Sequence, residues 1–341
     1  MKILFLSRRF YPDIGGVEKH VLEIGKIMVK EGHKVTVITQ SPGKEIEYQN
    51  IKIIRIPKTP KGASEKLHVW KWFWKNRQLI KDADIVHAHD VYWWYWPYKF
   101  IFLSKKSFIT FHGYESYPIK KSSIIIRRIS AFLATGNIEV GEFIRKWYGT
   151  KADFVIYGGV EESNFNYQIS NKQESINKND ESAIFIGRLD EDTGILEYLE
   201  AERKIKKHFN NFNLKIIGDG KYKHKIKSKN HIGFITNYHK YLHSANYVFS
   251  SSYLMILEAL SHKKLVFSVY SNDLKKDYLL NTPFKDYIII CKNVNELIDN
   301  FFYFQKNPNK EKVKTERGYK WAKNQTWENL VNKYYKLWEK K

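Results

Sequence analysis

AIFIGRLDEDTGILEYLEA, residues 183–201, is the stretch of sequence that decides the fold. Its first four residues form a short apolar run typical of a buried strand, and apolar residues recur at helical spacing from Ile195 onward. An acidic turn lies between them, with Arg188 before it and Thr193-Gly194 after it. This order predicts a strand, a tight loop and a helix whose first backbone N–H groups point beyond the strand end. A phosphate group can bind at such a helix start, and the planar guanidinium of Arg188 could donate further hydrogen bonds to its oxygens. An ordinary turn with a solvated arginine would show the same sequence pattern.

The same alternation of strands and helices continues on both sides of this stretch. In the first half, strand candidates occur at 3–6, 35–39, 51–56, 84–89, 107–112 and 152–156. In the second half, they occur at 183–186, 214–217, 232, 247–251, 265–269 and 287–291. We therefore predict an α/β protein with two doubly wound, Rossmann-like domains that face a cleft. The predicted parts are an N-terminal domain at 1–160, a polar linker at 161–182, a C-terminal domain at 183–315 and a terminal helix at 316–341 that crosses back.

Charge is the most unusual feature of the composition. The chain has 58 Lys and Arg against 36 Asp and Glu, a net charge of +22, which favours anionic partners such as phosphorylated substrates, anionic lipid or nucleic acid. Its single cysteine, Cys291, excludes an internal disulfide and fits a reducing compartment. No apolar run is long enough for a membrane span, and the first residues do not form a signal peptide, so we expect a cytoplasmic protein.

Polar residues stand at the predicted carboxyl ends of strands in the first half. His89, His112 and the pair Gly15-Gly16 are expected to share one rim, because the carboxyl ends of parallel strands meet at one edge. His87 is expected on the opposite face of its strand. Glu18 begins a helix, where the helix dipole alone favours a carboxylate.

Two stretches combine aromatic and basic residues, WKWFWK at 70–75 and YWWYWPYKFIF at 92–102. Trp and Tyr next to Lys are typical of membrane interfaces, so we predict that the first domain docks on anionic membranes. Burial of these rings in the core is the alternative. We predict no specific nucleic-acid partner, because no nucleic-acid binding module can be recognised.

Several short motifs occur in the order that a known enzyme family shows. They are GGVEKH (15–20), VHAHD (86–90), TFHGYE (110–115), IGRLDEDTG (186–194), IIGDG (216–220), SSSYLMILEAL (250–260) and TWENLVNKYYKLWEK (326–340). Together they resemble the glycosyltransferases of family 4, which have the GT-B fold. The resemblance covers nearly the whole chain.

This resemblance implies a hexosyltransferase that moves a sugar from a nucleotide diphosphate sugar to a lipid-linked or surface-glycan (polysaccharide) acceptor. Configuration would be retained without a metal or other cofactor, at the inner face of the cytoplasmic membrane. His112 and Arg188 would be catalytic, and Glu18 and His89 would lie on the acceptor side. The donor would be bound by Gly15, Gly16, Arg188, Thr193, Gly218, Gly220 and Glu258.

Two positions depart from the family pattern. Thr193 stands where the family has a lysine near the diphosphate, and Ser250 stands where it has the first glutamate of a pair. We predict that another cation, Arg8, Arg9 or a neighbouring lysine, replaces the missing one. The alternatives are a catalytically weak family member that serves as a binding or partner subunit, and a polyanion-binding protein supported by charge alone.

Overall fold

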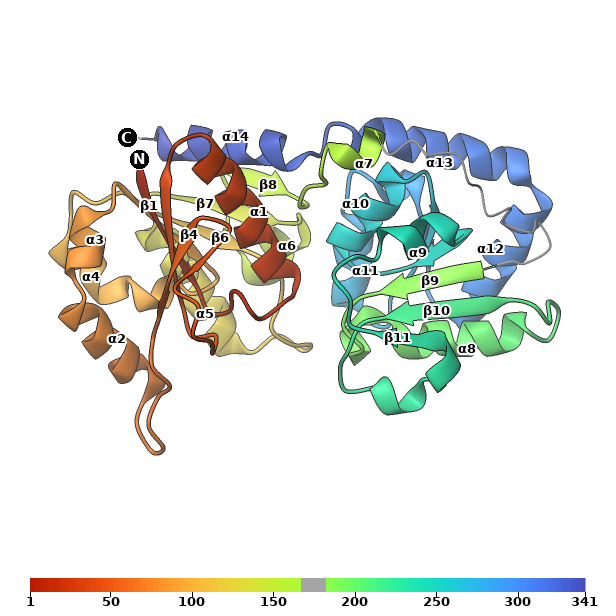
Figure 1. Ribbon diagram of the computed structural model, residues 1–341, viewed down its shortest axis with the longest axis horizontal. Coiled ribbons are helices and arrows are strands. Elements are labelled where there is room, and N and C mark those ends of the chain that lie inside the picture. The colour runs from red at the N-terminus through yellow and green to blue at the C-terminus, as the bar shows by residue number, and fades with distance from the viewer. Residues whose placement is uncertain (167–181, 341) are drawn as a thin grey trace. The chain divides into compact units, whose positions relative to one another are not determined.

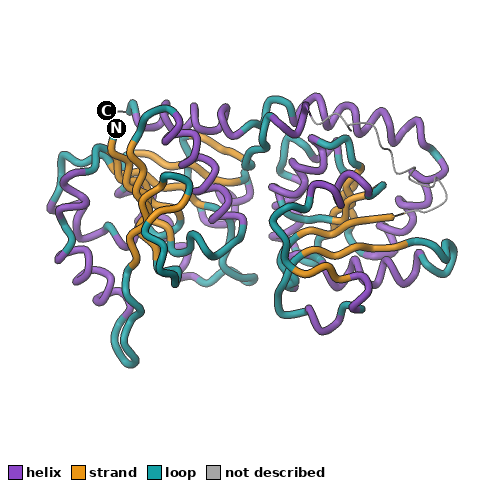
Figure 2. The backbone as a smooth tube through the Cα atoms, in the orientation of Figure 1, coloured by secondary structure: helices purple, strands orange, loops and turns teal. Residues whose placement is uncertain are grey.

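The computed structural model describes residues 1–166 and 182–340. The chain divides into two compact units, Met1–Gly158 together with Trp327–Lys341, and Gly159–Thr326. Each unit holds one sheet with helices packed along it, as the ribbon and tube drawings show (Figure 1, Figure 2). The linker predicted at 161–182 lies mostly outside the described residues.

The first unit contains a sheet in the order β3-β4-β2-β1-β5-β6-β7-β8, in which only β3 runs antiparallel to its neighbour. Its strands are β1 (Lys2–Ser7), β2 (Lys34–Thr39), β3 (Glu47–Tyr48), β4 (Ile51–Arg55), β5 (Ile85–His89), β6 (Ser107–Phe111), β7 (Gly136–Val140) and β8 (Phe154–Ile156). Its helices are α1 (Gly16–Lys30), α2 (Glu65–Lys75), α3 (Gln78–Asp82), α4 (Trp96–Ile101), α5 (Lys121–Leu133), α6 (Phe143–Tyr148) and α14 (Trp327–Trp338). Strand order reverses between β1 and β5, which is where open α/β sheets bind ligands.

The second unit contains an all-parallel sheet in the order β11-β10-β9-β12-β13-β14. Its strands are β9 (Ser182–Ile186), β10 (Asn213–Ile217), β11 (His231–Gly233), β12 (Tyr247–Phe249), β13 (Leu265–Val269) and β14 (Ile289–Cys291). Its helices are α7 (Ser163–Asn166), α8 (Ile195–Ile205), α9 (His239–Ser244), α10 (Tyr253–Ser261), α11 (Asp273–Leu280), α12 (Val294–Lys306) and α13 (Pro308–Ala322). The prediction of two parallel-sheet α/β domains is confirmed.

Strand β7 is a central element that the sequence pattern did not predict. Its sequence, GNIEV, carries polar residues at positions that a buried strand usually fills with apolar ones. Hydrogen bonds satisfy part of this polarity: the Asn137 backbone N–H donates to Asp153 Oδ2 at 2.8 Å, and the Thr150 hydroxyl donates to Glu139 Oε1. Asn137 Oδ1 and Glu139 Oε2 stay buried without a partner among the described residues. Hydrogen bonds from later residues therefore compensate a burial that hydrophobicity alone would not favour.

The aromatic stretch at 92–102 is mainly core, so its interpretation as a membrane-facing set of rings is wrong for most of its residues. Tyr92, Trp93, Trp94, Tyr95 and Tyr98 are all buried. They pack beneath α2, whose Phe73 ring lies 6.1 Å from the Trp94 ring and 5.9 Å from the Tyr98 ring. At the end of the stretch, the Phe100 and Ile101 side chains remain exposed.

Candidate active site

The carboxyl ends of β5 and β6 bring together two of the predicted site residues. His89 Nδ1 lies 2.9 Å from His112 Nε2, and the two rings are 5.1 Å apart. His89 is buried and His112 is half-buried. Burial, followed by the nearby His87 and Arg127, lowers the pKa of His112 to about 3, so this imidazole is neutral at physiological pH.

His87 lies on the same face of β5 as His89, with the two rings stacked at 5.2 Å. The prediction that it lies on the opposite face was wrong, because side chains two residues apart in a strand point to the same side. His87 is completely buried, and burial lowers its pKa well below the usual range.

A chain of buried hydrogen bonds links α14 to β5, β6 and α1 next to the two site histidines. The Trp338 indole N–H donates to His87 Nδ1 at 3.0 Å, so neutral His87 carries its proton on Nε2 and donates to Thr110 Oγ1 at 2.8 Å. Thr110 Oγ1 is also hydrogen-bonded to Tyr334 Oη at 2.9 Å, and Tyr334 Oη is hydrogen-bonded to His20 Nε2 at 2.8 Å. The chain fixes the tautomer of His87 and ties α14 to the sheet. The sequence analysis gave Tyr334 no role beyond its place in the motif at 326–340.

Asp90, the residue after β5, adds a carboxylate to this rim. It adopts a left-handed backbone conformation (φ 63°), and its Oδ1 accepts the His112 backbone N–H at 2.9 Å. Burial raises the pKa of Asp90 to about 6, although the Arg127 guanidinium acts in the opposite direction. Asp90 is the last residue of the motif VHAHD, but the sequence analysis assigned no role to it.

Arg127, on α5, holds the acidic groups of this rim. Its Nη2 lies 2.9 Å from Glu115 Oε1 and 3.9 Å from Asp90 Oδ1. The guanidinium stacks on the Tyr148 ring at 3.9 Å, and the Tyr148 hydroxyl donates to Glu115 Oε2 at 2.6 Å. Because the side chain of Arg127 is buried, this cation is fixed in place.

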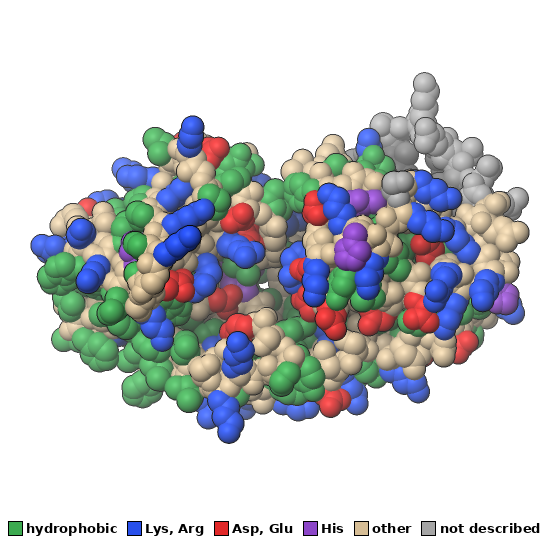
Figure 3. Space-filling model, turned by 90° about the horizontal axis from the view of Figure 1, so that it is seen from below, with side chains coloured by type: hydrophobic (Ala, Val, Ile, Leu, Met, Phe, Trp, Pro, Cys, Tyr) green, Lys and Arg blue, Asp and Glu red, His purple; other side chains and the backbone are tan. Residues whose placement is uncertain are grey.

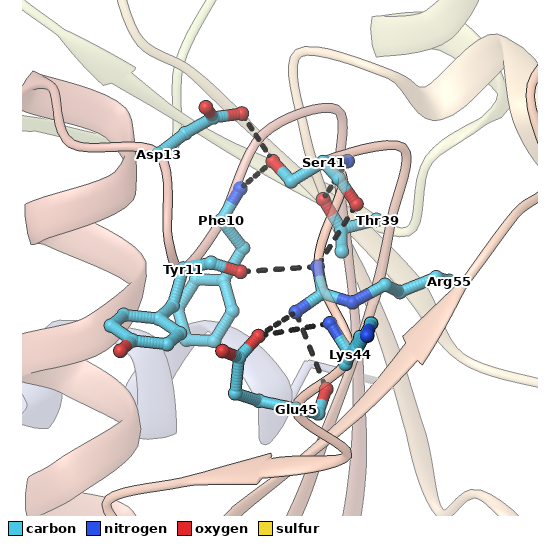
Figure 4. A network of polar contacts seen from close by, with 8 residues as sticks. All are labelled: Phe10, Tyr11, Asp13, Thr39, Ser41, Lys44, Glu45 and Arg55. Carbon is cyan, nitrogen blue, oxygen red and sulfur yellow. Dashed lines mark hydrogen bonds and ion pairs between the residues drawn. The ribbon is translucent and has the colours of Figure 1, made fainter.

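The glycine-rich loop after β1 is anchored from one side by Ser41 and Arg55 (Figure 4). The Phe10 N–H donates to Ser41 Oγ at 2.9 Å, and the Ser41 hydroxyl donates to Asp13 Oδ2 at 2.6 Å. Arg55 Nη1 donates to the carbonyl oxygens of Tyr11 and Ser41 at 3.1 and 2.9 Å. These contacts hold the loop up to the start of α1.

The Gly15-Gly16 pair stands directly before and at the start of α1, where Glu18 occupies the first turn. A Cβ at Gly15 would lie 2.4 Å from Glu18 Oε2, so the carboxylate folds back over this glycine. The nearby Arg8 side chain forms an ion pair with Glu65 at 3.3 Å, and Arg9 is exposed. Their proposed role toward a donor stays a prediction.

In the second unit, the loop between β9 and α8 has the predicted strand, loop and helix order. Arg188 donates to Asp190 Oδ2 at 2.8 Å and to Asp192 Oδ2 at 2.7 Å, with 59% of its side chain exposed. Two of the three acidic residues of this turn are therefore paired with Arg188. The Thr193 hydroxyl donates to the Asp190 carbonyl at 2.6 Å and does not cap α8, which begins after Gly194 in a left-handed conformation.

Gly218 and Gly220 follow β10 and lie against this loop. Both have φ values that side chains rarely adopt, +145° and +153°. A Cβ at Gly218 would lie 1.9 Å from the Gly187 carbonyl oxygen, and one at Gly220 would lie 2.7 Å from the Leu189 nitrogen. These glycines therefore allow two strand-end loops to pack backbone against backbone.

Glu258, on α10, is buried and already hydrogen-bonded. Its Oε2 accepts from Asn164 Nδ2 at 2.9 Å, and its Oε1 accepts from the Tyr238 hydroxyl at 3.2 Å. Ser250, at the family's first glutamate position, is buried with its carbonyl accepting the Ser268 hydroxyl at 2.6 Å. No cluster of three or more His, Cys, Asp or Glu side chains with metal-binding geometry occurs in the described part of the chain.

Comparisons with known proteins point to one family of enzymes. Residues 14–163 match the family described as Glycosyltransferase Family 4, and residues 166–321 match Glycosyl transferases group 1. An uncharacterized glycosyltransferase of Methanocaldococcus jannaschii is 24% identical over 99% of this chain and 98% of its own.

Solved structures give the same fold. A glycosyltransferase from Rickettsia africae superposes with a TM-score of 0.76 and 19% identity, over 99% of this chain and 98% of that one. Anabaena HepE, crystallised with UDP, superposes with a TM-score of 0.75 and 15% identity, over 98% of this chain and 99% of that one. The superpositions show the GT-B fold, and the family matches along both units identify the chain as a glycosyltransferase of the family 4 type.

Proposed function

We propose that this glycosyltransferase takes its sugar from a nucleotide diphosphate sugar and transfers it with retention of configuration, without a metal or other cofactor. The observation that carries the proposal is the exposed Arg188 guanidinium beyond the carboxyl end of β9, beside the start of α8. A departing diphosphate gains negative charge in the transition state, and a guanidinium with nearby N–H donors stabilises it there. UDP bound to the Anabaena relative supports a nucleotide donor.

His112 is the proposed contact to the transferred sugar. Its hydrogen bond with His89 uses Nε2, which leaves Nδ1 as the ring nitrogen for a ligand. Because its pKa is near 3, His112 would act as a neutral hydrogen-bonding group and not as a cation or general acid. The Asp90 carboxylate holds its backbone, so the position of the ring is fixed before substrate arrives.

The remaining predicted residues keep their roles as proposals. Gly15, Gly16, Thr193, Gly218 and Gly220 would lie close to the donor through backbone or hydroxyl groups. Glu258 would contact the donor ribose, and Glu18 and His89 would face the acceptor.

We propose a lipid-linked or surface-glycan acceptor, reached by docking on the inner face of the cytoplasmic membrane. An apolar surface of α4 and α5 supports this proposal. Its exposed side chains are Phe100, Ile101, Leu103, Ile125, Ile129 and Phe132. In Figure 3, hydrophobic side chains gather with Lys and Arg along the margin of the left-hand unit, which is a composition suited to anionic lipid. No helix in residues 1–166 and 182–340 is long and apolar enough to cross a membrane.

Vesicle sedimentation tests the docking proposal. The protein should sediment with vesicles that contain phosphatidylglycerol and much less with pure phosphatidylcholine, and salt should weaken binding because basic residues contribute about 1 kcal/mol each. Ile129→Ser with Phe132→Ser should reduce sedimentation, whereas Val313→Ser, an exposed apolar residue of the second unit, should not. Equal sedimentation of both variants would contradict a role for the α4 and α5 surface.

The donor is tested by isothermal titration with UDP, GDP and ADP sugars, followed by NMR of the product's anomeric configuration. Tight binding of one donor and a product with the donor's configuration would support retaining transfer. Inversion would contradict the proposed stereochemistry, and no binding by any donor would contradict the proposed function.

A partner-subunit role is the second candidate, and two observations favour it: Thr193 replaces the family lysine and Ser250 the family glutamate. It predicts donor binding without turnover in the isolated protein. Turnover by the isolated protein would exclude it.

A further inference from the structure

Lys275 is a buried lysine in the first turn of α11, directly after β13. Only 7% of its surface is exposed. Its Nζ lies 4.1 Å from the centre of the Tyr278 ring, one turn further along the same helix. Among the described residues, this ammonium group has no hydrogen-bond acceptor and no ion-pair partner within 4.0 Å. The Lys275 side chain is thus mostly removed from solvent, and no described residue accepts a hydrogen bond from its ammonium group, which leaves this group available to a ligand.

The end of β13, which leads into α11, lies against the loop that carries Arg188. Gly194 closes that loop, and a Cβ on it would lie 2.7 Å from Val269 Cγ2, at the end of β13. The charged groups that act on Lys275 are Asp192 and Arg188, both from the same loop. Burial lowers the pKa of Lys275 to about 8, and Asp192 partly offsets this effect. Lys275 thus belongs to the electrostatic environment of the proposed diphosphate site.

This loop needs a second cation if it is to hold a diphosphate. It contains one positive side chain, Arg188, and three negative ones at 190–192. Arg188 is already shared by Asp190 and Asp192. The Thr193 hydroxyl, which stands in the place of the family lysine, is used to close the turn.

Resting on the proposed function, we propose that Lys275 binds the donor diphosphate and replaces the positive charge lost at position 193. The diphosphate would provide the acceptor that this ammonium group lacks among the described residues. Lys275 follows β13, which is the second strand from β9 in the order β9-β12-β13. Its positive charge would therefore reach the diphosphate from a different strand end than that of Arg188.

The test compares nucleoside diphosphates with monophosphates by isothermal titration. UDP, GDP and ADP are titrated first, and the best binder is then compared with its monophosphate. Lys275→Met should lower the diphosphate affinity about tenfold and the monophosphate affinity less than about twofold, as expected for one lost charge-assisted contact. Lys276→Met, which removes an exposed lysine from the next position of α11, is the matched control and should change neither affinity.

Two further measurements distinguish a diphosphate contact from a structural lysine. Wild-type diphosphate affinity should fall above about pH 8, where free Lys275 loses its proton, whereas Lys275→Arg should keep its affinity to higher pH. Thr193→Lys should restore diphosphate affinity in the Lys275→Met background.

Each outcome has a defined meaning. Equal loss of mono- and diphosphate affinity in Lys275→Met, or no loss of either, would overturn the assignment while leaving the donor proposal intact. Failure of the wild-type protein to bind UDP, GDP or ADP would overturn both. Thermal melting of each variant verifies that an affinity change does not come from unfolding.

Discussion

Replacing Asp90 by asparagine should stabilise the first unit at neutral pH, although it removes a charge from the rim. The amide oxygen of asparagine can still accept the His112 N–H that Asp90 Oδ1 accepts at 2.9 Å. Arg127 keeps Glu115, its nearer partner at 2.9 Å, whereas Asp90 lies 3.9 Å away. The main change is therefore the removal of a carboxylate that burial disfavours.

The sign and size of the effect follow from the pKa of Asp90, which is raised from 3.8 to about 6. A raised pKa means that the folded state binds the proton more tightly. The protonated Asp90 carboxyl therefore makes its full contribution to the free energy of unfolding below pH 3.8, and this contribution is lost as the pH rises toward 6. Two pKa units correspond to about 2.7 kcal/mol. Because 34% of the side chain is exposed, solvent screening reduces the expected effect to about 1–2 kcal/mol.

Urea unfolding followed by tryptophan fluorescence measures this effect in the relevant unit, because every tryptophan except Trp321 belongs to the first unit. The stability difference between Asp90→Asn and wild type should increase in favour of the variant from pH 4 to pH 7.5. Asp82→Asn, at an exposed carboxylate of the same unit, should show no such trend. A variant that is less stable than wild type at pH 7.5 would refute the reasoning and show that attraction to Arg127 outweighs burial.

Three other substitutions test separate parts of the site. Arg188→Ala should weaken nucleoside diphosphate binding by about 2 kcal/mol in titration, the scale of a lost charge-assisted contact, and unchanged affinity would remove it from the site. Gly218→Ala should lower the urea midpoint of the second unit strongly, because its Cβ would lie 1.9 Å from the Gly187 carbonyl oxygen, whereas Gly113→Ala meets nothing within 4 Å and serves as the control. Tyr334→Phe should cost about 2 kcal/mol in urea unfolding, because it removes the hydrogen-bond partner of buried His20 Nε2 and one of the two partners of Thr110, and an unchanged midpoint would argue against the hydrogen-bond chain.

The fold could be predicted from sequence because short apolar runs alternate with helical periodicity along both halves. Strand β7 shows where this signal fails, since Asn137 and Glu139 are buried only with the help of hydrogen bonds from residues 150–153. The same limit applies to the rings at 92–95. Their density resembles a membrane interface, and only the packing of α2 shows that they are core.

The site could be predicted in part for the same topological reason. His89 and His112 end neighbouring parallel strands, so their proximity follows from strand order. Tyr334 could not be found this way, because it reaches Thr110 across 224 residues through the packing of α14. Lys275 was missed because a lysine in a run such as SNDLKKD usually lies at the surface, and its burial depends on the tertiary fold.

Lys275 also changes what the loss of the family lysine means. In a parallel sheet, every loop at the carboxyl edge borders the same space, so a side chain from the loop after β9 and one from the helix after β13 can approach one ligand from two sides. Position 193 could then change to threonine, whose hydroxyl closes the turn before α8, without leaving the acidic loop to repel the diphosphate. A cation fixed by burial also loses less side-chain entropy on binding than one on an exposed loop. Thr193 is therefore weak evidence for an inactive protein as long as the effect of Lys275→Met on diphosphate binding has not been measured.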